Sequence, residues 1–78
     1  MGQMINKGNE LIRINPKDSN RLEYSTDGGR VWMNRFAGSS LCGSFNDLSD
    51  NGKEILGLTS NGLFYSTDGG RVWARRGR

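Results

Sequence analysis

The sequence has no histidine, one cysteine and one proline among its 78 residues. Without histidine it lacks the side chain that most often acts as a general base near neutral pH. A zinc site of the usual Cys and His ligands is not expected, and the lone Cys42 cannot form a disulfide within the chain. We therefore expect no metal, no cofactor and no recognisable catalytic set.

Long apolar runs are also absent. No segment approaches the roughly 20 apolar residues of a membrane helix, and residues 1–13 lack the apolar core of a secretory signal. No segment keeps a 3.6-residue apolar period over three turns, so no helix is predicted. We expect a soluble chain with no signal peptide and no membrane partner, and its compartment is not indicated.

Charge is only mildly unbalanced. Eleven Lys and Arg face eight Asp and Glu, for a formal charge of +3. Four basic residues lie near the end of the chain, at Arg71, Arg75, Arg76 and Arg78. Clustered charge alone does not identify a partner. We interpret these residues as a solvated strand face and a polar terminus rather than as a patch for phosphate or acidic glycan, and we do not expect nucleic-acid binding.

What the chain does contain is an internal repeat. The nine letters YSTDGGRVW occupy residues 24–32 and return unchanged at residues 65–73. Residues 6–15 also align with 50–59, residues 16–18 form an insertion in the first copy, and residues 19–35 align with 60–76. We therefore expect a single domain, residues 1–78, built from two repeats at about 6–36 and 41–76.

Each copy shows strand signals. Short apolar runs rich in β-branched and large aliphatic residues are bounded by Gly, Asn, Asp and Ser. The predicted strands are residues 11–14, 22–25 and 30–36 in the first copy, and residues 41–48, 54–59, 63–66 and 71–76 in the second. Little sequence precedes residue 6, so we expect the opening strand of the first copy to be cut short or supplied from elsewhere. The chain is predicted to be all-β, with two antiparallel β-sheet repeats.

The Asp-Gly-Gly step between the last two strands of each copy indicates a hairpin, because glycine adopts positive φ without a steric clash. We expect Ser25 and Asp27 to accept hydrogen bonds from the N–H groups of their own turn, with Ser66 and Asp68 doing the same in the second copy. Trp32 and Trp73 are expected to pack against a neighbouring sheet.

Residues 25–32 and 66–73 resemble the Asp-box, or BNR repeat, whose pattern is Ser-x-Asp-x-Gly-x-Thr-Trp. Val31 and Val72 stand where that pattern has Thr. The resemblance implies blades like those of sialidase-like β-propellers, in which the box is a structural element. The box residues that match are Ser25, Asp27, Gly29, Trp32, Ser66, Asp68, Gly70 and Trp73.

The resemblance does not bring an active site with it. Sialidases use an arginine triad, a tyrosine nucleophile paired with a glutamate, and an aspartate acid/base, and none of these can be assigned here. Tyr24 and Tyr65 belong to the repeat itself, so we interpret them as half-buried strand residues. Asp47, Asp50 and Glu54 are close in sequence, and we interpret them as turn caps rather than as paired carboxylates or calcium ligands.

The sequence therefore favours a non-catalytic binding or structural module, with glycan as the ligand class implied by the resemblance. The alternative is a truncated or assembly-dependent relative of a sialidase-type glycoside hydrolase. Ligand candidates lie just beyond the motif, where the two copies begin to differ: Arg35, Phe36, Arg75 and Arg76.

Two blades cannot close a ring, because closed propellers have about four to eight. Side chains alternate between the two faces of a strand, so Leu63 and Tyr65 lie on one side and Phe64 lies on the other. Apolar residues on both sides are typical of a sheet stacked between two others. A monomer would leave one apolar face exposed. We expect a homo-oligomer, such as three chains with six blades. The competing interpretation is a fragment or remnant of a longer propeller that folds as a small sandwich or distorted barrel.

Overall fold

The computed structural model describes residues 4–76, which form eight strands in two antiparallel four-stranded sheets and no helix. The first sheet contains β1 (Met4–Lys7), β2 (Glu10–Ile14), β3 (Leu22–Ser25) and β4 (Met33–Phe36). The second contains β5 (Phe45–Asp50), β6 (Ile55–Thr59), β7 (Gly62–Ser66) and β8 (Ala74–Arg75). The prediction of an all-β chain with two antiparallel sheets is confirmed. Within residues 4–76 there is accordingly no helix that could cross a membrane.

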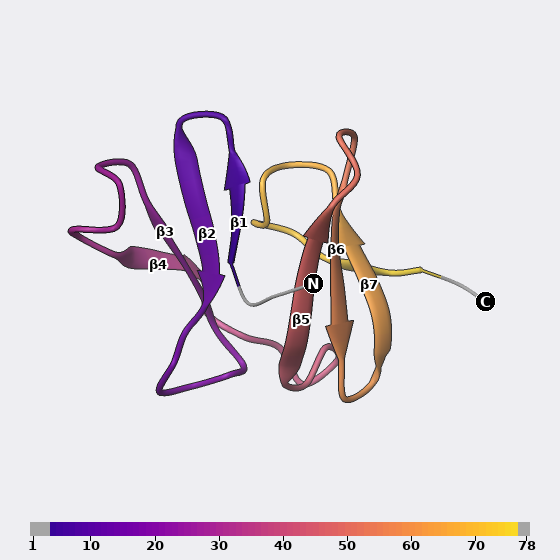
Figure 1. Ribbon diagram of the computed structural model, residues 1–78. Helices are drawn as coiled ribbons and strands as arrows, with labels where there is room; N and C mark the ends of the chain where they lie inside the picture. Colours follow the sequence, from indigo (N-terminus) through magenta and orange to yellow (C-terminus); the bar gives the residue numbers. More distant parts are fainter. Residues whose placement is uncertain (1–3, 77–78) are drawn as a thin grey trace.

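In each sheet every strand pairs with the strand that follows it in sequence. The two sheets lie next to one another, with β1 and β2 against β5 (Figure 1). A connection over residues 37–44 joins them. Each sequence copy therefore forms one complete meander, and the second meander packs on the first.

The first copy has its own opening strand, so of the two expected alternatives, a strand cut short or one supplied from elsewhere, the second is wrong. Residues 4–7 of β1 pair in antiparallel register with residues 13–10 of β2. β1 has four described residues, and β5 has six. The sequence signal was weak because only Met4 and Ile5 are apolar in this strand. Residues 1–3 lie outside the described part of the chain.

For three other strands the predicted first residue was wrong. β4 begins at Met33 rather than residue 30, and β8 begins at Ala74 rather than residue 71, because the intervening N–H groups donate to the motif aspartates. β5 begins at Phe45 rather than residue 41. A turn occupies residues 39–43, where the N–H of Gly43 donates to the carbonyl oxygen of Ser39 at 3.0 Å.

The core lies between the sheets. Ile12, Ile14 and Leu22 contribute from the first sheet, and the connection contributes Cys42. The second sheet contributes Phe45, Leu48, Ile55, Phe64 and Trp73. The ring of Trp73 lies 5.2 Å from that of Phe45 and 6.3 Å from that of Phe36, measured between centroids. These aromatic contacts join the two sheets, and such rings carry large apolar areas into a core.

The two faces of each sheet are named here by the side chain that marks them. The arginine face of the first sheet carries Ile12, Ile14, Leu22, Tyr24 and Arg35, and that of the second carries Leu56, Leu58, Leu63, Tyr65 and Arg76. The tryptophan face of the first sheet carries Met4, Leu11, Arg13, Glu23 and Trp32, and that of the second carries Leu48, Ile55, Gly57, Phe64 and Trp73. Within the chain, the arginine face of the first sheet packs on the tryptophan face of the second.

A β-bulge accounts for two consecutive inward side chains in β4. Leu22 pairs with Phe36, but the next residue, Glu23, pairs with Asn34, so Arg35 is the extra residue of the bulge. A bulge re-aims side chains that simple alternation would send to opposite faces. Both Arg35 and Phe36 therefore point toward the second sheet.

Candidate functional site

The motif loops, residues 25–32 and 66–73, hold themselves together through one serine and one aspartate each. In the first loop the Ser25 hydroxyl donates to Oδ1 of Asp27 at 2.7 Å and accepts from the N–H of Gly29 at 2.9 Å. Oδ1 of Asp27 also accepts from the N–H groups of Arg30 at 3.1 Å and Val31 at 3.0 Å. The prediction that these side chains accept hydrogen bonds from their own turn is confirmed.

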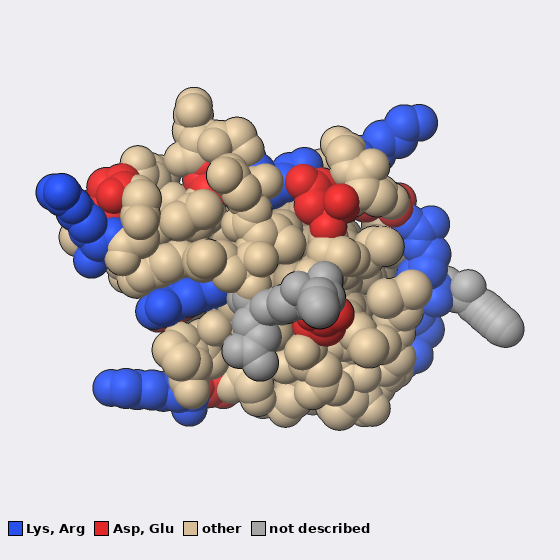
Figure 2. Space-filling model, in the orientation of Figure 1, with Lys and Arg blue, Asp and Glu red and all other residues tan. Residues whose placement is uncertain are grey.

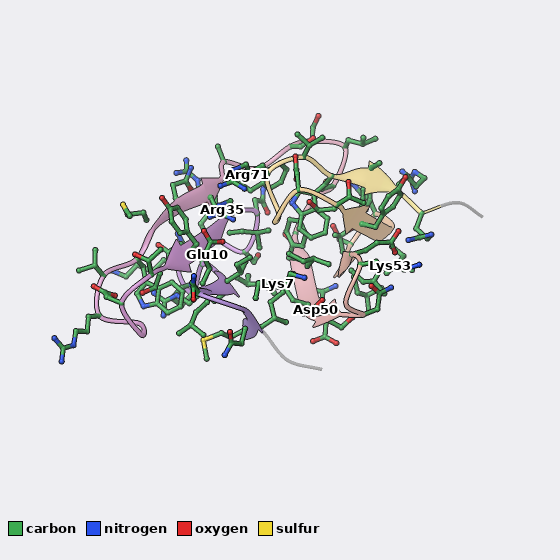
Figure 3. The ribbon with its side chains drawn as sticks, turned by 90° about the horizontal axis from the view of Figure 1, so that it is seen from above. Lys7, Glu10, Arg35, Asp50, Lys53 and Arg71 are labelled. Carbon is green, nitrogen blue, oxygen red and sulfur yellow. The ribbon has the colours of Figure 1, made fainter. Side chains whose placement is uncertain are left out.

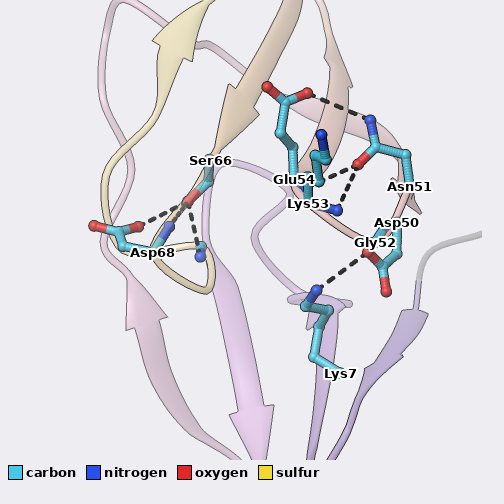
Figure 4. A network of polar contacts seen from close by, with 9 residues as sticks. Lys7, Asp50, Asn51, Gly52, Lys53, Glu54, Ser66 and Asp68 are labelled. Atoms are coloured by element: carbon cyan, nitrogen blue, oxygen red, sulfur yellow. Dashed lines mark hydrogen bonds and ion pairs between the residues drawn. The ribbon is translucent and has the colours of Figure 1, made fainter.

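The second loop repeats this arrangement. The Ser66 hydroxyl donates to Oδ1 of Asp68 at 2.8 Å and accepts from the N–H of Gly70 at 2.9 Å (Figure 4). Asp68 accepts from the N–H groups of Arg71 and Val72 at 3.1 and 3.0 Å. The two loops thus share the same serine and aspartate hydrogen bonds although one faces the core and the other does not.

These hydrogen bonds also fix the protonation of the two aspartates. The N–H of Val31, followed by the Ser25 hydroxyl, holds the pKa of Asp27 below its ordinary value. The N–H of Val72 and the Ser66 hydroxyl do the same for the pKa of Asp68. A carboxylate that accepts several hydrogen bonds is stabilised in its charged form. Both aspartates are therefore suited to holding a turn and not to donating protons near neutral pH.

Arg35 makes three contacts on the arginine face of the first sheet. Its guanidinium carbon lies 4.0 Å from the centroid of the Tyr24 ring, and Nη2 pairs with Glu10 at 2.9 Å. Nη1 donates to the carbonyl oxygen of Gly69, in the second motif loop, at 2.6 Å. Only 2% of the Arg35 side chain is exposed. Arg35 therefore fastens the second motif loop to the first sheet.

Figure 3 shows Glu10 and Arg35 side by side, with Arg71 close to them. The hydrogen bond from Arg35 is the main cause of the lowered pKa of Glu10, and the charges of Arg35 and Arg71 lower it further. Lys7 and Asp50 form a second polar contact between the sheets, at 3.2 Å (Figures 3 and 4). The intersheet contact is thus an apolar centre with ion pairs at its margin.

Arg76 makes the equivalent contacts in the second sheet. Its guanidinium carbon lies 4.3 Å from the centroid of the Tyr65 ring, and Nη2 pairs with Glu54. Glu54, Tyr65 and Arg76 occupy the aligned positions of Glu10, Tyr24 and Arg35. The difference is exposure, because 41% of the Arg76 side chain is accessible to solvent.

The two motif tryptophans lie in different surroundings. Trp73 is 8% exposed, and its indole N–H donates to the carbonyl oxygen of Gly70 at 2.9 Å. Trp32 is only partly buried, and the guanidinium of Arg13 stacks over it at 4.0 Å. Arg13 also pairs with Glu23 at 2.9 Å. The expectation that Trp32 packs against a neighbouring sheet was therefore wrong for the single chain, whose second sheet lies on the other side.

The four predicted ligand residues separate into two pairs. Arg35 donates to Gly69 of the second sheet's motif loop, and the ring of Phe36 lies edge-on to that of Phe45, with 6.0 Å between centroids. Arg35 and Phe36 therefore both contribute to the contact between the sheets. Arg75 and Arg76 are exposed. Arg75 donates to the carbonyl oxygen of Asn61 at 2.8 Å. The structure does not bring the four residues together into one site.

Acidic residues are likewise engaged locally. Asp50 accepts from Lys7 and from the N–H of Gly52, and the latter bond is the largest cause of its lowered pKa. Glu54 pairs with Arg76 and accepts from Asn51. Residues 4–76 contain no cluster of His, Cys, Asp and Glu with the geometry of a metal site. On the face in Figure 2, most of the Lys and Arg side chains lie toward the margin.

The Glu–Arg–Tyr contact is the feature that the motif-based reasoning missed. Glu10 was not singled out, and Arg35 was assigned to a ligand surface. The alignment of the two copies carried a usable signal, because it matches Glu10 with Glu54, Tyr24 with Tyr65, and Arg35 with Arg76. Comparison of the chain with protein-family models, curated sequences and solved structures gave no match.

Proposed function

We propose that the chain is a non-catalytic structural and binding module made of Asp-box blades. The supporting observation is the use of its polar side chains. The motif serines and aspartates hold their own loops, and Arg35, which pairs with Glu10, donates to Gly69 and so joins the sheets. Groups that are fully hydrogen-bonded and ionised in this way stabilise a scaffold, whereas an acid/base pair needs pKa values brought toward the working pH.

A sialidase-type hydrolase is the alternative that this proposal must exclude. The phenol ring of Tyr24 lies under the guanidinium of Arg35, and that of Tyr65 lies under Arg76. A tyrosine nucleophile would need its hydroxyl free to reach a sugar carbon and a base to take its proton. Because both rings serve as stacking partners, we assign them to the scaffold.

The hydrolase alternative is tested with a fluorogenic sialoside and the purified chain across a range of protein concentrations. We expect no turnover above the rate without protein. Turnover that is retained through purification and lost in the Tyr24→Phe or Tyr65→Phe variant would overturn the proposal. The Thr67→Ala variant is a matched control, because Thr67 is exposed and lies two positions from Tyr65.

Glycan is the ligand class that we propose for the binding role, with Trp32 as the contact. Its indole is partly exposed, and the guanidinium of Arg13, which pairs with Glu23, covers one face of the ring and leaves the opposite face for a sugar. A flat apolar ring with polar groups beside it can stack on a sugar face and hydrogen-bond its hydroxyls. Trp73 in the other copy is covered, so only Trp32 offers this surface.

The glycan proposal is tested by titrating sugars at low protein concentration while following tryptophan fluorescence. We expect a saturable change that persists in a Trp73→Phe variant and disappears in Trp32→Phe. No change with sugar at about 1 mM, which corresponds to a binding free energy of about −4 kcal/mol, would contradict glycan binding and leave the scaffold role to stand alone.

A further inference from the structure

The outer face of the second sheet repeats the chemistry of a face that is buried within the same chain. The arginine face of the first sheet is covered by the second sheet, and there Ile14 is 5% exposed and Leu22 is 0% exposed. Their counterparts on the arginine face of the second sheet are Leu58 at 49% and Leu63 at 37%. Apolar side chains are therefore present at both positions in both copies, but only one copy has a covering sheet.

The polar group on this face is repeated as well. Arg76 stacks on Tyr65 and pairs with Glu54 as Arg35 stacks on Tyr24 and pairs with Glu10. Arg35 makes one additional contact, from Nη1 to the carbonyl oxygen of Gly69 in the adjacent motif loop. Arg76 is held in the same stacked arrangement with 41% of its side chain exposed. The arginine face of the second sheet is thus preformed for another motif loop.

The chain carries a face of the complementary kind at its other end. The tryptophan face of the second sheet contacts the first sheet, whereas no strand among residues 4–76 packs on the tryptophan face of the first sheet. Leu48, which is 1% exposed at the intersheet contact, corresponds to Met4, which is 53% exposed. The first motif loop has the same serine and aspartate hydrogen bonds as the second, so it presents Gly28 where the second presents Gly69.

We propose that copies of this chain associate head to tail, with the arginine face of the second sheet packed on the tryptophan face of the first sheet in the next copy. Arg76 then donates to the carbonyl oxygen of Gly28 in the next copy, as Arg35 does to Gly69. The contact joins two different surfaces, so repeating it adds chains in one direction until the assembly closes on itself. This inference does not depend on the glycan or scaffold role, but a second copy and a glycan would compete for the same tryptophan face.

The contact between copies is more polar than the contact within a chain. Arg13 and Glu23 stand where the second sheet has Gly57 and Phe64, and they form an ion pair that is about one quarter exposed on average. The Lys7–Asp50 pair also has no counterpart, because the aligned residues are Asn51 and Asn6. Charged residues at an interface core weaken association. We therefore expect the assembly to be reversible and to depend on protein concentration.

The test is the mass of the full chain by light scattering and sedimentation, at protein concentrations up to about 1 mM. We expect a mass that rises with concentration to a fixed multiple of the monomer. The double variant Leu58→Lys and Leu63→Lys blocks one face and Met4→Lys blocks the other, and each should raise the dissociation constant by about tenfold or more. Val72→Lys is the matched control, because Val72 is 66% exposed in a motif loop and is expected to leave the mass unchanged.

Mixing the two blocked variants tests whether the contact is head to tail. Each retains one intact face, so the mixture should form a one-to-one dimer and nothing larger. Far-UV circular dichroism of each variant verifies that these exposed substitutions leave the sheets folded. A wild-type monomer at all concentrations would overturn the proposal. So would an assembly that persists in both blocked variants, or folded blocked variants that fail to pair when mixed.

Discussion

Each copy of the motif contains one tryptophan, and the two tryptophans are buried to different extents. One can therefore serve as the control for the other in a prediction about stability. Replacing Trp73 by alanine should lower the free energy of unfolding by about 3–5 kcal/mol, the range for large aromatic residues in cores. Its indole is 8% exposed, lies beside the rings of Phe36 and Phe45, and donates a hydrogen bond to Gly70. A chain of this length has a stability of roughly 4–12 kcal/mol, so the loss is a large fraction.

Replacing Trp32 by alanine should cost only about 1–2 kcal/mol in the monomer. This indole is partly buried, and its defined partner is the guanidinium of Arg13, a contact worth about 0.5–1 kcal/mol at an exposed site. The sequence around the two tryptophans is identical from residue 24 to 32 and from 65 to 73, so local propensity cancels between the variants. The difference between their losses in free energy of unfolding therefore measures how much the packing of the second sheet on the first contributes.

The assay is urea unfolding at 25 °C, followed by far-UV circular dichroism because each variant lacks one fluorophore. It is run at low protein concentration, where association does not cover Trp32. If Trp73→Ala does not fold, Trp73→Phe keeps an aromatic ring, and its loss should still exceed that of Trp32→Phe. Equal losses for the two positions, or a larger loss at Trp32, would refute the assignment of inner and outer tryptophan faces.

Three further predictions concern polar groups and close packing. Arg35→Met should destabilise the chain by about 2–3 kcal/mol, which is less than the loss for a fully buried ion pair because the Glu10 side chain is 28% exposed. The equivalent change Arg76→Met should cost less than about 1 kcal/mol. The two variants are compared by the urea concentration at the midpoint of unfolding. Gly57→Ala should cost about 1–3 kcal/mol by overpacking, because a Cβ there would lie 2.7 Å from an aromatic ring, and an unchanged thermal midpoint would contradict this. Because the folded-state pKa of Asp68 is lowered, its ionised carboxylate stabilises the fold. This stabilisation is present above the unfolded-state pKa of about 3.9 and is lost as the pH falls through the folded-state pKa. Asp68→Asn should therefore destabilise the chain at pH 7 and flatten the decline in melting temperature below about pH 4, which a thermal melt series in acid checks.

The sequence was sufficient to predict the two central strands of each sheet. β3 at Leu22–Ser25 was predicted at its observed bounds, and β6 and β7 were each predicted to within one residue. The beginnings of β4 and β8 were missed because they depend on competition for backbone N–H groups. The carboxylates of Asp27 and Asp68 take N–H groups that strand pairing would otherwise use. The alternation of apolar and polar residues does not predict which backbone N–H groups donate to these aspartates.

The burial of Arg35 was not predicted, for a different reason. An arginine near a chain segment that differs between copies is ordinarily solvent-exposed. Here the bulge opposite Leu22 and Glu23 turns it inward, and Glu10 neutralises it. A bulge arises from pairing between strands that are apart in sequence, so a pattern within β4 alone does not predict it. Comparing aligned positions of the two copies would have identified the Glu–Arg–Tyr set without identifying which copy buries it.

The short outer strands have a consequence for how copies of the chain can meet. β8 has two residues, and β4 has four and is interrupted by the bulge in its pairing with β3. Adding a strand from another chain requires a long, regular row of unpaired N–H and C=O groups, and a fibril requires that row to be repeated indefinitely. The β4 and β8 margins lack such a row. Edge-to-edge growth through these two margins is therefore disfavoured by the fold itself, and the association proposed above would use the sheet faces, where side-chain shape limits the number of partners.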